Sequence, residues 1–204
     1  MLVDRGDYRL VAARIRKADT TTRGRWLSVI GCFDVLRIIE ADARGLVPMN
    51  GREFAEAWGL GTMRTWDTWR AILEEAGVLS EVAGGFELPA LDRLPVGVKT
   101  PLTRAIAVDA MRYRLGVQRL ARLDVDGRRW WSALGVWGLM RFVEGDPSSR
   151  VVPFSSTELA ETYGVDPRTW SKLLDLLEQA EFGTPAATGW QCAAFRAKRR
   201  GSKS

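Results

Sequence analysis

The chain contains no histidine and only two cysteines among its 204 residues. Without an imidazole it cannot build a Ser-His-Asp or Cys-His catalytic site or a zinc site that uses histidine, and two cysteines cannot supply four thiolate ligands. Two cysteines are also too few for a disulfide framework, so they suit a reducing compartment. Cys32 lies in an apolar segment, where we expect it to pack in the core. We therefore expect a protein that is not an enzyme and that binds no metal or cofactor.

Long apolar runs are also missing. No run approaches the roughly 18 residues that a membrane-spanning helix needs, and the first ten residues lack the apolar core of a secretion signal. The hydrophobic fraction of 46% and the charged fraction of 27% are ordinary for a globular protein. We expect a cytoplasmic, nucleoid-associated protein that makes no membrane contact.

Positive charge is unevenly distributed along the chain. Residues 1–95 contain 13 Lys and Arg against 14 Asp and Glu, whereas residues 96–204 contain 17 against 11. A basic run at a chain end is usually solvated or contacts a polyanion. The tail formed by residues 196–204 is such a run, and its candidate polyanion contacts are Arg196, Lys198, Arg199 and Arg200.

Comparing the chain with itself reveals an internal repeat. Matching residues recur in the same order at an offset of 104 or 105, so single-residue insertions are enough to align the two copies. Chance similarity would not keep its order over such a length, and we infer a tandem duplication. The matched segments include Val3–Arg14 with Val108–Arg119, Arg25–Gly31 with Arg129–Gly135, and Arg64–Trp66 with Arg168–Trp170.

The repeat divides the chain into four parts. We predict a first repeat over residues 1–90 and a second over residues 101–195. Residues 91–100 contain Pro95 and Gly97 and are interpreted as a linker. Residues 196–204 form the basic tail.

Each repeat is expected to open with two helices. The first is amphipathic and covers roughly residues 4–18 or 101–123, and the second is strongly apolar and covers about 25–42 or 129–145. A helix that is apolar over most of its circumference is usually the buried centre of a small domain. The apolar positions of the amphipathic helices are Tyr8, Val11 and Ile15 in the first repeat, and Met111, Leu115 and Leu120 in the second.

The second part of each repeat has sharper signals. A short extended stretch at 46–48 or 151–153 precedes a capping-box pattern, Asn50 with Glu53 or Ser155 with Glu158. The short helix that follows should end at a glycine turn, at 59 or 164. A longer helix should start near 62 or 166 and end near 76 or 180. Hairpins are expected after it, formed by residues 77–79 and 83–86 in the first repeat and with a turn at 184–189 in the second.

This part resembles the helix-turn-helix pattern, in which a small residue of the first helix precedes the turn glycine by four positions. Ala160 and Gly164 fit without a gap, whereas Ala55 and Gly59 fit with one additional residue before Trp66. The order helix, strand, helix, helix, hairpin is similar to winged-helix regulators of the GntR and MarR type. The resemblance implies a mainly α fold of two duplicated winged-helix domains, each a helical bundle with a small β-hairpin wing.

In such proteins the second helix of the motif enters the major groove of DNA, where its amino-terminal half meets base edges. The alternative is that these side chains only solvate an exposed helix face. The candidate DNA-binding residues are Thr62, Arg64, Thr65 and Thr68 in the first repeat, Arg168, Thr169, Ser171 and Lys172 in the second, and the four basic tail residues named above.

The nine tryptophans allow two interpretations, core packing or stacking on nucleic-acid bases. Trp66 and Trp170 occupy matched apolar positions, which favours the core. Trp131 has no aromatic counterpart in the other repeat and is the candidate for stacking.

Two functional hypotheses follow. The first is sequence-specific binding of double-stranded DNA by a monomer or homodimer, as a transcriptional regulator or a plasmid or phage replication or partition factor. The two recognition helices differ in sequence, so the half-sites should differ. The alternative is a tandem winged-helix scaffold for a chromosome- or plasmid-maintenance complex. The slightly acidic first repeat, whose wing carries Glu81 and Glu87, would then bind a protein partner.

Overall fold

The structure is a computed structural model that describes residues 2–20, 25–89, 106–124, 127, 129–146 and 148–195. The predicted linker at 91–100 and the basic tail at 196–204, with its four candidate contacts, lie outside the described residues. The described part is mainly helical and contains small antiparallel sheets.

The same order of elements occurs in both halves of the chain. The first half contains β1 (Leu2–Val3), α1 (Arg5–Ala18), α2 (Trp26–Asp34), the π-helical segment η1 (Val35–Glu40), β2 (Leu46–Val47), α3 (Gly51–Ala57), α4 (Met63–Glu75), β3 (Ser80–Val82) and β4 (Gly85–Glu87). The second half contains β5 (Ile106–Ala107), α5 (Ala110–Leu123), α6 (Trp130–Gly138), the π-helical segment η3 (Leu139–Glu144), β6 (Val151–Val152), α7 (Ser156–Tyr163), α8 (Pro167–Gln179), β7 (Gly183–Ala186) and β8 (Gly189–Cys192).

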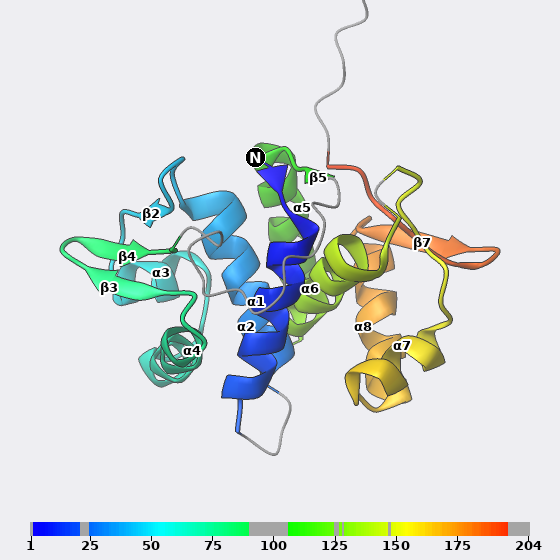
Figure 1. Ribbon diagram of the computed structural model, residues 1–204, viewed down its shortest axis with the longest axis horizontal. Coiled ribbons are helices and arrows are strands. Elements are labelled where there is room, and N and C mark those ends of the chain that lie inside the picture. Colours follow the sequence, from blue (N-terminus) through cyan, green and yellow to red (C-terminus); the bar gives the residue numbers. More distant parts are fainter. Residues whose placement is uncertain are drawn as a thin grey trace, which may run out of the picture.

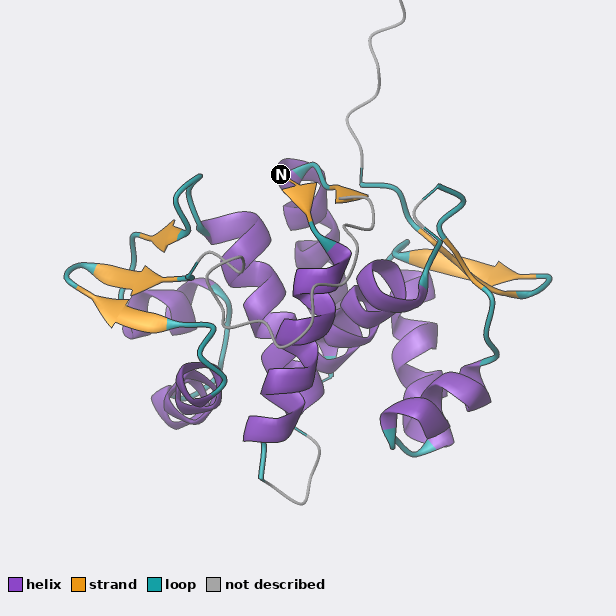
Figure 2. Ribbon diagram, in the orientation of Figure 1, coloured by secondary structure: helices purple, strands orange, loops and turns teal. Residues whose placement is uncertain are grey.

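Each half carries one three-stranded antiparallel sheet, ordered β2-β4-β3 in the first and β6-β8-β7 in the second. The two sheets lie at opposite ends of the molecule, and α1, α2, α5 and α6 lie between them (Figures 1 and 2). The expected extended stretches and both hairpins are therefore present. The second hairpin is tighter than predicted, because Thr184 already belongs to β7 and pairs with Gln191.

The opening helix of the second half begins later than predicted. It starts at Ala110 rather than at residue 101, because Ile106 and Ala107 form a strand that pairs with β1. Asp109 then caps the helix by accepting a hydrogen bond from the Arg112 backbone N–H at 3.1 Å. A side-chain cap of this kind satisfies a donor that the first turn of a helix leaves without a partner.

The buried face of α5 was also predicted wrongly in part. Met111 is 66% exposed and Leu115 is 54% exposed, whereas Leu120 is fully buried as expected. The core-facing positions are those of Tyr113 and Val117, which are fully buried. The positions predicted for α1, namely Tyr8, Val11 and Ile15, are all buried.

The two halves meet where α2 and α6 cross, and both helices have a glycine there. A Cβ on Gly31 would overlap the carbonyl oxygen of Trp131, and a Cβ on Gly135 would overlap that of Leu27. The two contacts are reciprocal, because Gly135 lies 104 positions after Gly31 and Trp131 lies 104 positions after Leu27. Reciprocal contacts between equivalent residues are typical of a twofold interface. An approximate twofold axis therefore relates the central helices.

Two further contacts lie on the same axis. The side-chain oxygens of Ser28 and Ser132, again 104 positions apart, are 2.7 Å from each other. At the other end, β1 pairs with β5 so that Leu2 lies opposite Ala107. The halves thus join as the two subunits of a symmetric dimer would, within one chain.

The opening helices cross from one half to the other. On α1, the Arg5 guanidinium donates to the backbone oxygen of Val143 in η3, at 2.7 Å from Nη2. On α5, Arg114 forms an ion pair with Glu40 at the end of η1, at 2.6 Å. Buried residues of both halves form a single hydrophobic core. Neither half encloses its core alone.

One buried carboxyl breaks the approximate symmetry. Asp34, which is 1% exposed, accepts a hydrogen bond from the Tyr8 hydroxyl at 3.0 Å. The equivalent residue is Gly138, where any Cβ would overlap both the Tyr8 hydroxyl and the Asp34 carboxylate. Burial raises the pKa of Asp34 well above its ordinary value, although the bond from Tyr8 opposes the shift. Burial, and after it the Asp34 charge, raise the pKa values of Tyr8 and Tyr113.

The raised pKa of Asp34 predicts a pH-dependent loss of stability. Above the ordinary value of 3.8, the unfolded chain releases a proton that the folded protein retains, so stability falls as pH rises toward the raised pKa. Asp34→Asn keeps an acceptor for Tyr8 but cannot ionise. The free energy of unfolding of the variant, relative to that of the wild type, should therefore increase as pH rises, by at most about 1.4 kcal/mol per pH unit. Urea unfolding across a pH series from about 5 to 8 measures this difference.

Asp42→Asn is the matched control, because hydrogen bonds from backbone N–H groups lower the pKa of Asp42. The bond from Leu46 makes the largest contribution. That carboxyl is ionised throughout the series in both the folded and the unfolded chain. Parallel stability profiles for the wild type and Asp34→Asn would contradict the prediction.

Candidate nucleic-acid interface

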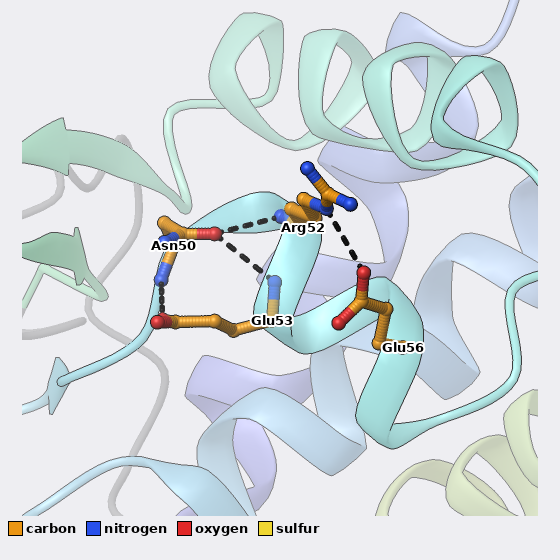
Figure 3. A network of polar contacts seen from close by, with 4 residues as sticks. All are labelled: Asn50, Arg52, Glu53 and Glu56. Carbon is orange, nitrogen blue, oxygen red and sulfur yellow. Dashed lines mark hydrogen bonds and ion pairs between the residues drawn. The ribbon is translucent and has the colours of Figure 1, made fainter.

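The first helix of each predicted helix-turn-helix is fixed by a capping box, as expected. In α3, the Asn50 side chain accepts hydrogen bonds from the backbone N–H groups of Arg52 and Glu53, both at 3.0 Å (Figure 3). The Glu53 carboxylate accepts the Asn50 backbone N–H in return, at 2.8 Å. Ser155 and Glu158 make the same reciprocal pair at the start of α7. The carboxylates of both boxes thus serve as helix caps.

The turns between the helix pairs explain the additional residue of the first repeat. Gly164 ends α7 with a φ of 64°, a left-handed conformation that favours glycine. The first half uses two such residues, Gly59 with a φ of 62° and Gly61 with a φ of 66°. The additional residue is absorbed in this turn. As a result Trp66 and Trp69 still face the core and are 1% and 7% exposed.

An aromatic side chain anchors each second helix to its half. Trp66 of α4 packs against Phe54 and Phe86, with ring centroids 4.8 and 5.1 Å away. Trp170 of α8 stacks on Tyr163 of α7 with centroids 5.8 Å apart and rings 2° from parallel. Because these anchors fix which face of each helix is buried, the opposite face is presented to solvent.

The residues predicted to contact DNA on α4 and α8 fall into two groups, those whose side chains form hydrogen bonds within their own helix and those whose side chains do not. The Thr68 hydroxyl donates to the Arg64 backbone oxygen at 2.8 Å, and the Thr169 hydroxyl donates to the Asp166 carboxylate at 3.1 Å. The hydroxyl oxygens of Thr62 and Thr65 lie 3.1 Å apart. These four hydroxyls therefore stabilise the helices. The other predicted contacts are exposed and form no ion pair within the described residues, and they are Arg64, Arg168, Ser171 and Lys172.

The outward face of α8 is more cationic than that of α4. At the two positions where α8 carries Ser171 and Lys172, α4 carries Asp67 and Thr68. The N-cap Asp166 of α8 is an anion at neutral pH, because the Thr169 backbone N–H and hydroxyl lower its pKa. The two cations of α8, Arg168 and Lys172, lie within its first two turns and outnumber this single anion.

The two hairpins contribute no positive charge. Neither hairpin, at 80–87 or at 183–192, contains a lysine or an arginine. In the first hairpin, Glu81 forms an ion pair at 2.6 Å with Arg70 of α4, and Arg70 also lies 4.0 Å from the Glu74 carboxylate. Electrostatic attraction of DNA by the described residues must therefore come from outside the two hairpins, and of the two second helices the outward face of α8 offers more positive charge than that of α4.

The stacking role predicted for Trp131 is wrong. Its side chain is 2% exposed, its ring stacks on Trp130 at 3.8 Å, and Trp69 of α4 covers it edge-on at 5.3 Å. Trp131 faces the first half because α6 crosses α2 at this point, where its counterpart is Leu27. Cys32 is fully buried, as expected for a core residue.

Sequence reasoning missed a group of cations beside the second helix pair. Arg9, Arg16 and Lys17 of α1 lie next to η3 and the end of α7. A Cβ placed on Gly164 would lie 3.3 Å from the Arg16 guanidinium, which sets this cation beside the turn before α8. The sequence places these residues in the first repeat, and no local pattern reveals that α1 crosses to the second half.

Comparisons with protein-family models, with curated proteins and with solved structures gave no match for this chain. Within the described residues, no helix has both the length and the apolar character needed to cross a membrane. The same residues contain no group of three or more cysteine or carboxylate side chains arranged to hold a metal ion.

Proposed function

We propose that this chain is a sequence-specific double-stranded DNA-binding protein that uses two winged helix-turn-helix units. The observation that carries the proposal is the pair α4 and α8, equivalent helices in the two halves that present polar amino-terminal halves to solvent. Dimeric helix-turn-helix proteins place two such helices in the major groove, one per half-site. Here one chain supplies both helices.

The winged-helix assignment is supported by the order of elements and by the sheets. Each half has a helix, a short strand, two helices joined by a glycine turn, and a hairpin whose second strand pairs with the first strand of the unit. Because α4 and α8 differ at their outward positions, the two half-sites should differ in sequence. The site would then be asymmetric, with its stronger half under α8.

Regulation of transcription and replication or partition of a plasmid or phage all need specific DNA binding, and each fits this proposal, with the protein at the nucleoid. A scaffold role is the second candidate. It is favoured by the first half, whose wing acid Glu81 neutralises Arg70 and whose hairpin has no cation. In that role α4 and its wing would bind a protein partner rather than DNA.

DNA affinity should depend more on Arg168 than on Arg64. An arginine in the first turn of a recognition helix can pair with guanine, and its loss typically costs about 1–3 kcal/mol and relaxes preference at one position. We expect this result for Arg168→Ala and a smaller loss for Arg64→Ala, because α4 carries Asp67 where α8 carries Ser171. Fluorescence anisotropy with a duplex selected from random sequence, and with its scrambled form, measures both.

Arg112→Ala is the matched control. Arg112 is exposed in the first turn of α5, which begins beside β5 at the top of the view, whereas α4 and α7 lie in its lower part (Figure 1). This variant should bind as the wild type does. If the full-length protein binds no duplex at low salt, DNA binding is excluded and the scaffold becomes the preferred function.

A further inference from the structure

Two clefts lie between the halves, at equivalent places. The α1 cleft is lined by α1, the start of α2, η3 and the end of α7, and its volume is about 540 Å³. The α5 cleft is lined by α5, the start of α6, the end of η1 and the end of α3, and its volume is about 670 Å³. Small-molecule sites usually occupy roughly 300–1,000 Å³, so both clefts have a suitable size. Their chemistry differs.

In the α5 cleft, the charges of the lining residues largely compensate one another. Its walls include three carboxylates, and the only two cations among its described lining residues are Arg114 and Arg122. Arg114 is already paired with Glu40 at 2.6 Å, and Glu40 also accepts a hydrogen bond from the Trp58 indole N–H at 3.0 Å. This arrangement leaves little positive charge for a ligand.

The α1 cleft carries an excess of positive charge. Three cations, Arg9, Arg16 and Lys17, line it together with a single acid, Glu144. The Glu144 carboxylate accepts a hydrogen bond from the Tyr163 hydroxyl at 2.6 Å and forms no ion pair with these cations within the described residues. Arg9 donates to the backbone oxygen of Val143 at 3.5 Å, which leaves Arg16 and Lys17 as the cations available to an external anion.

The walls of the α1 cleft also offer apolar and aromatic surface. The Arg16 guanidinium lies over the Trp26 ring at 5.4 Å, and the Trp26 and Tyr163 rings have centroids 6.0 Å apart. Leu139 and Val143 of η3 form the adjoining wall. A bare inorganic anion would leave this apolar surface unused. A purely apolar ligand would supply no counter-ion for Arg16 and Lys17.

We propose that the α1 cleft binds a small organic anion with a flat apolar body, such as an aromatic carboxylate. Arg16 and Lys17 would hold the anionic group through charge-assisted hydrogen bonds, which are stronger than neutral ones. The body would lie against Trp26 and the apolar wall of η3. The site combines residues of both halves, so it exists only when α1 is packed across η3.

One lining residue of the site, Tyr163, contacts the proposed DNA-reading helix, because its ring stacks on Trp170 of α8. A ligand against Tyr163 would touch the support of that helix directly. The binding proposal does not depend on DNA binding, and each can fail without the other.

The test compares two probes of nearly the same shape, the anion 2-naphthoate and its neutral amide 2-naphthamide, each titrated into the full-length protein by calorimetry and ligand-observed NMR. We expect 2-naphthoate to bind and 2-naphthamide to bind about tenfold more weakly, the size of one charge-assisted hydrogen bond. Arg16→Gln combined with Lys17→Gln should weaken 2-naphthoate by about tenfold as well and change 2-naphthamide little. Arg122→Gln in the α5 cleft is the control and should change neither.

Several outcomes would overturn the proposal. Equal binding of both probes would show that charge has no role, and an equal loss in Arg122→Gln would place the binding elsewhere. Displacement of 2-naphthoate by an equal concentration of inorganic phosphate would show that the cleft selects charge alone. Failure of 2-naphthoate to bind at millimolar concentration would also contradict the proposal. Thermal melts of every variant establish that the fold is kept.

Discussion

Replacing Gly135 with valine is expected to destabilise the folded protein by about 3 kcal/mol or more. The new side chain would overlap the carbonyl oxygen of Leu27, which belongs to the backbone of α2 and cannot rotate away. Relief would require α2 and α6 to separate, which would open the core that both halves share. Urea unfolding of the wild type and the variant measures the change in the free energy of unfolding.

A smaller substitution at the same position gives a sharper test, because the sign of its effect on stability is expected to be opposite to that in an ordinary helix. In an ordinary helix interior, alanine is more favourable than glycine by up to about 1 kcal/mol. Gly135→Ala should nevertheless be destabilising, because its Cβ meets the same carbonyl oxygen. Ala13→Val on the exposed face of α1 is the control and should cost only the small difference in helix propensity. A stabilising Gly135→Ala would show that the helices do not approach as closely as described.

The sequence contains one indication that α2 and α6 cross, namely a pair of glycines. Gly31 and Gly135 are matched in the repeat and lie within strongly apolar helices. A glycine inside a helical pattern is costly, and its presence often indicates close approach of another backbone. The sequence therefore marked the place of contact. It did not reveal the partner, because nothing in a repeat distinguishes contact within one copy from contact between copies.

The same ambiguity explains the errors on α5 and Trp131. The buried face of a helix depends on what packs against it, and α5 packs on η1 of the other half as well as on its own. A face inferred from one amphipathic pattern therefore included Met111 and Leu115, which the structure exposes. Trp131 is covered by α4 of the first half, a contact between residues distant in sequence. Elements that depend on local chemistry, such as the capping boxes and glycine turns, could be predicted well.

For the candidate site, the sequence predicted the helices and their outward positions but not the state of each side chain. The hydroxyls of Thr68 and Thr169 bond within their own helices, as threonine commonly does one turn back or at a helix start. Arg70 forms an ion pair with Glu81 of the first hairpin. These preferences depend on three-dimensional neighbours. The α1 cleft could not be predicted at all, since its walls come from both halves.

Trp170→Ala is expected to cost about 3–5 kcal/mol of stability, the range for removing a large buried aromatic side chain. Trp170 is 0% exposed, and its ring lies flat against Tyr163. Its loss would leave a cavity between α7 and α8, where the surrounding helices can collapse only in part. Urea unfolding, followed by far-UV circular dichroism, measures the free energy of unfolding.

Two further variants separate packing from other effects. Trp170→Phe should cost clearly less than Trp170→Ala, because phenylalanine keeps most of the ring and removes an indole N–H that has no acceptor among the described residues. A buried donor without a partner costs about 1–3 kcal/mol, so its removal offsets part of the lost contact. Ser171→Ala, at the exposed neighbouring position, should change stability by less than about 0.5 kcal/mol. If Trp170→Ala unfolds at the same urea concentration as Ser171→Ala, the tryptophan does not anchor α8. The assignment of its outward face to DNA would then lose its structural basis.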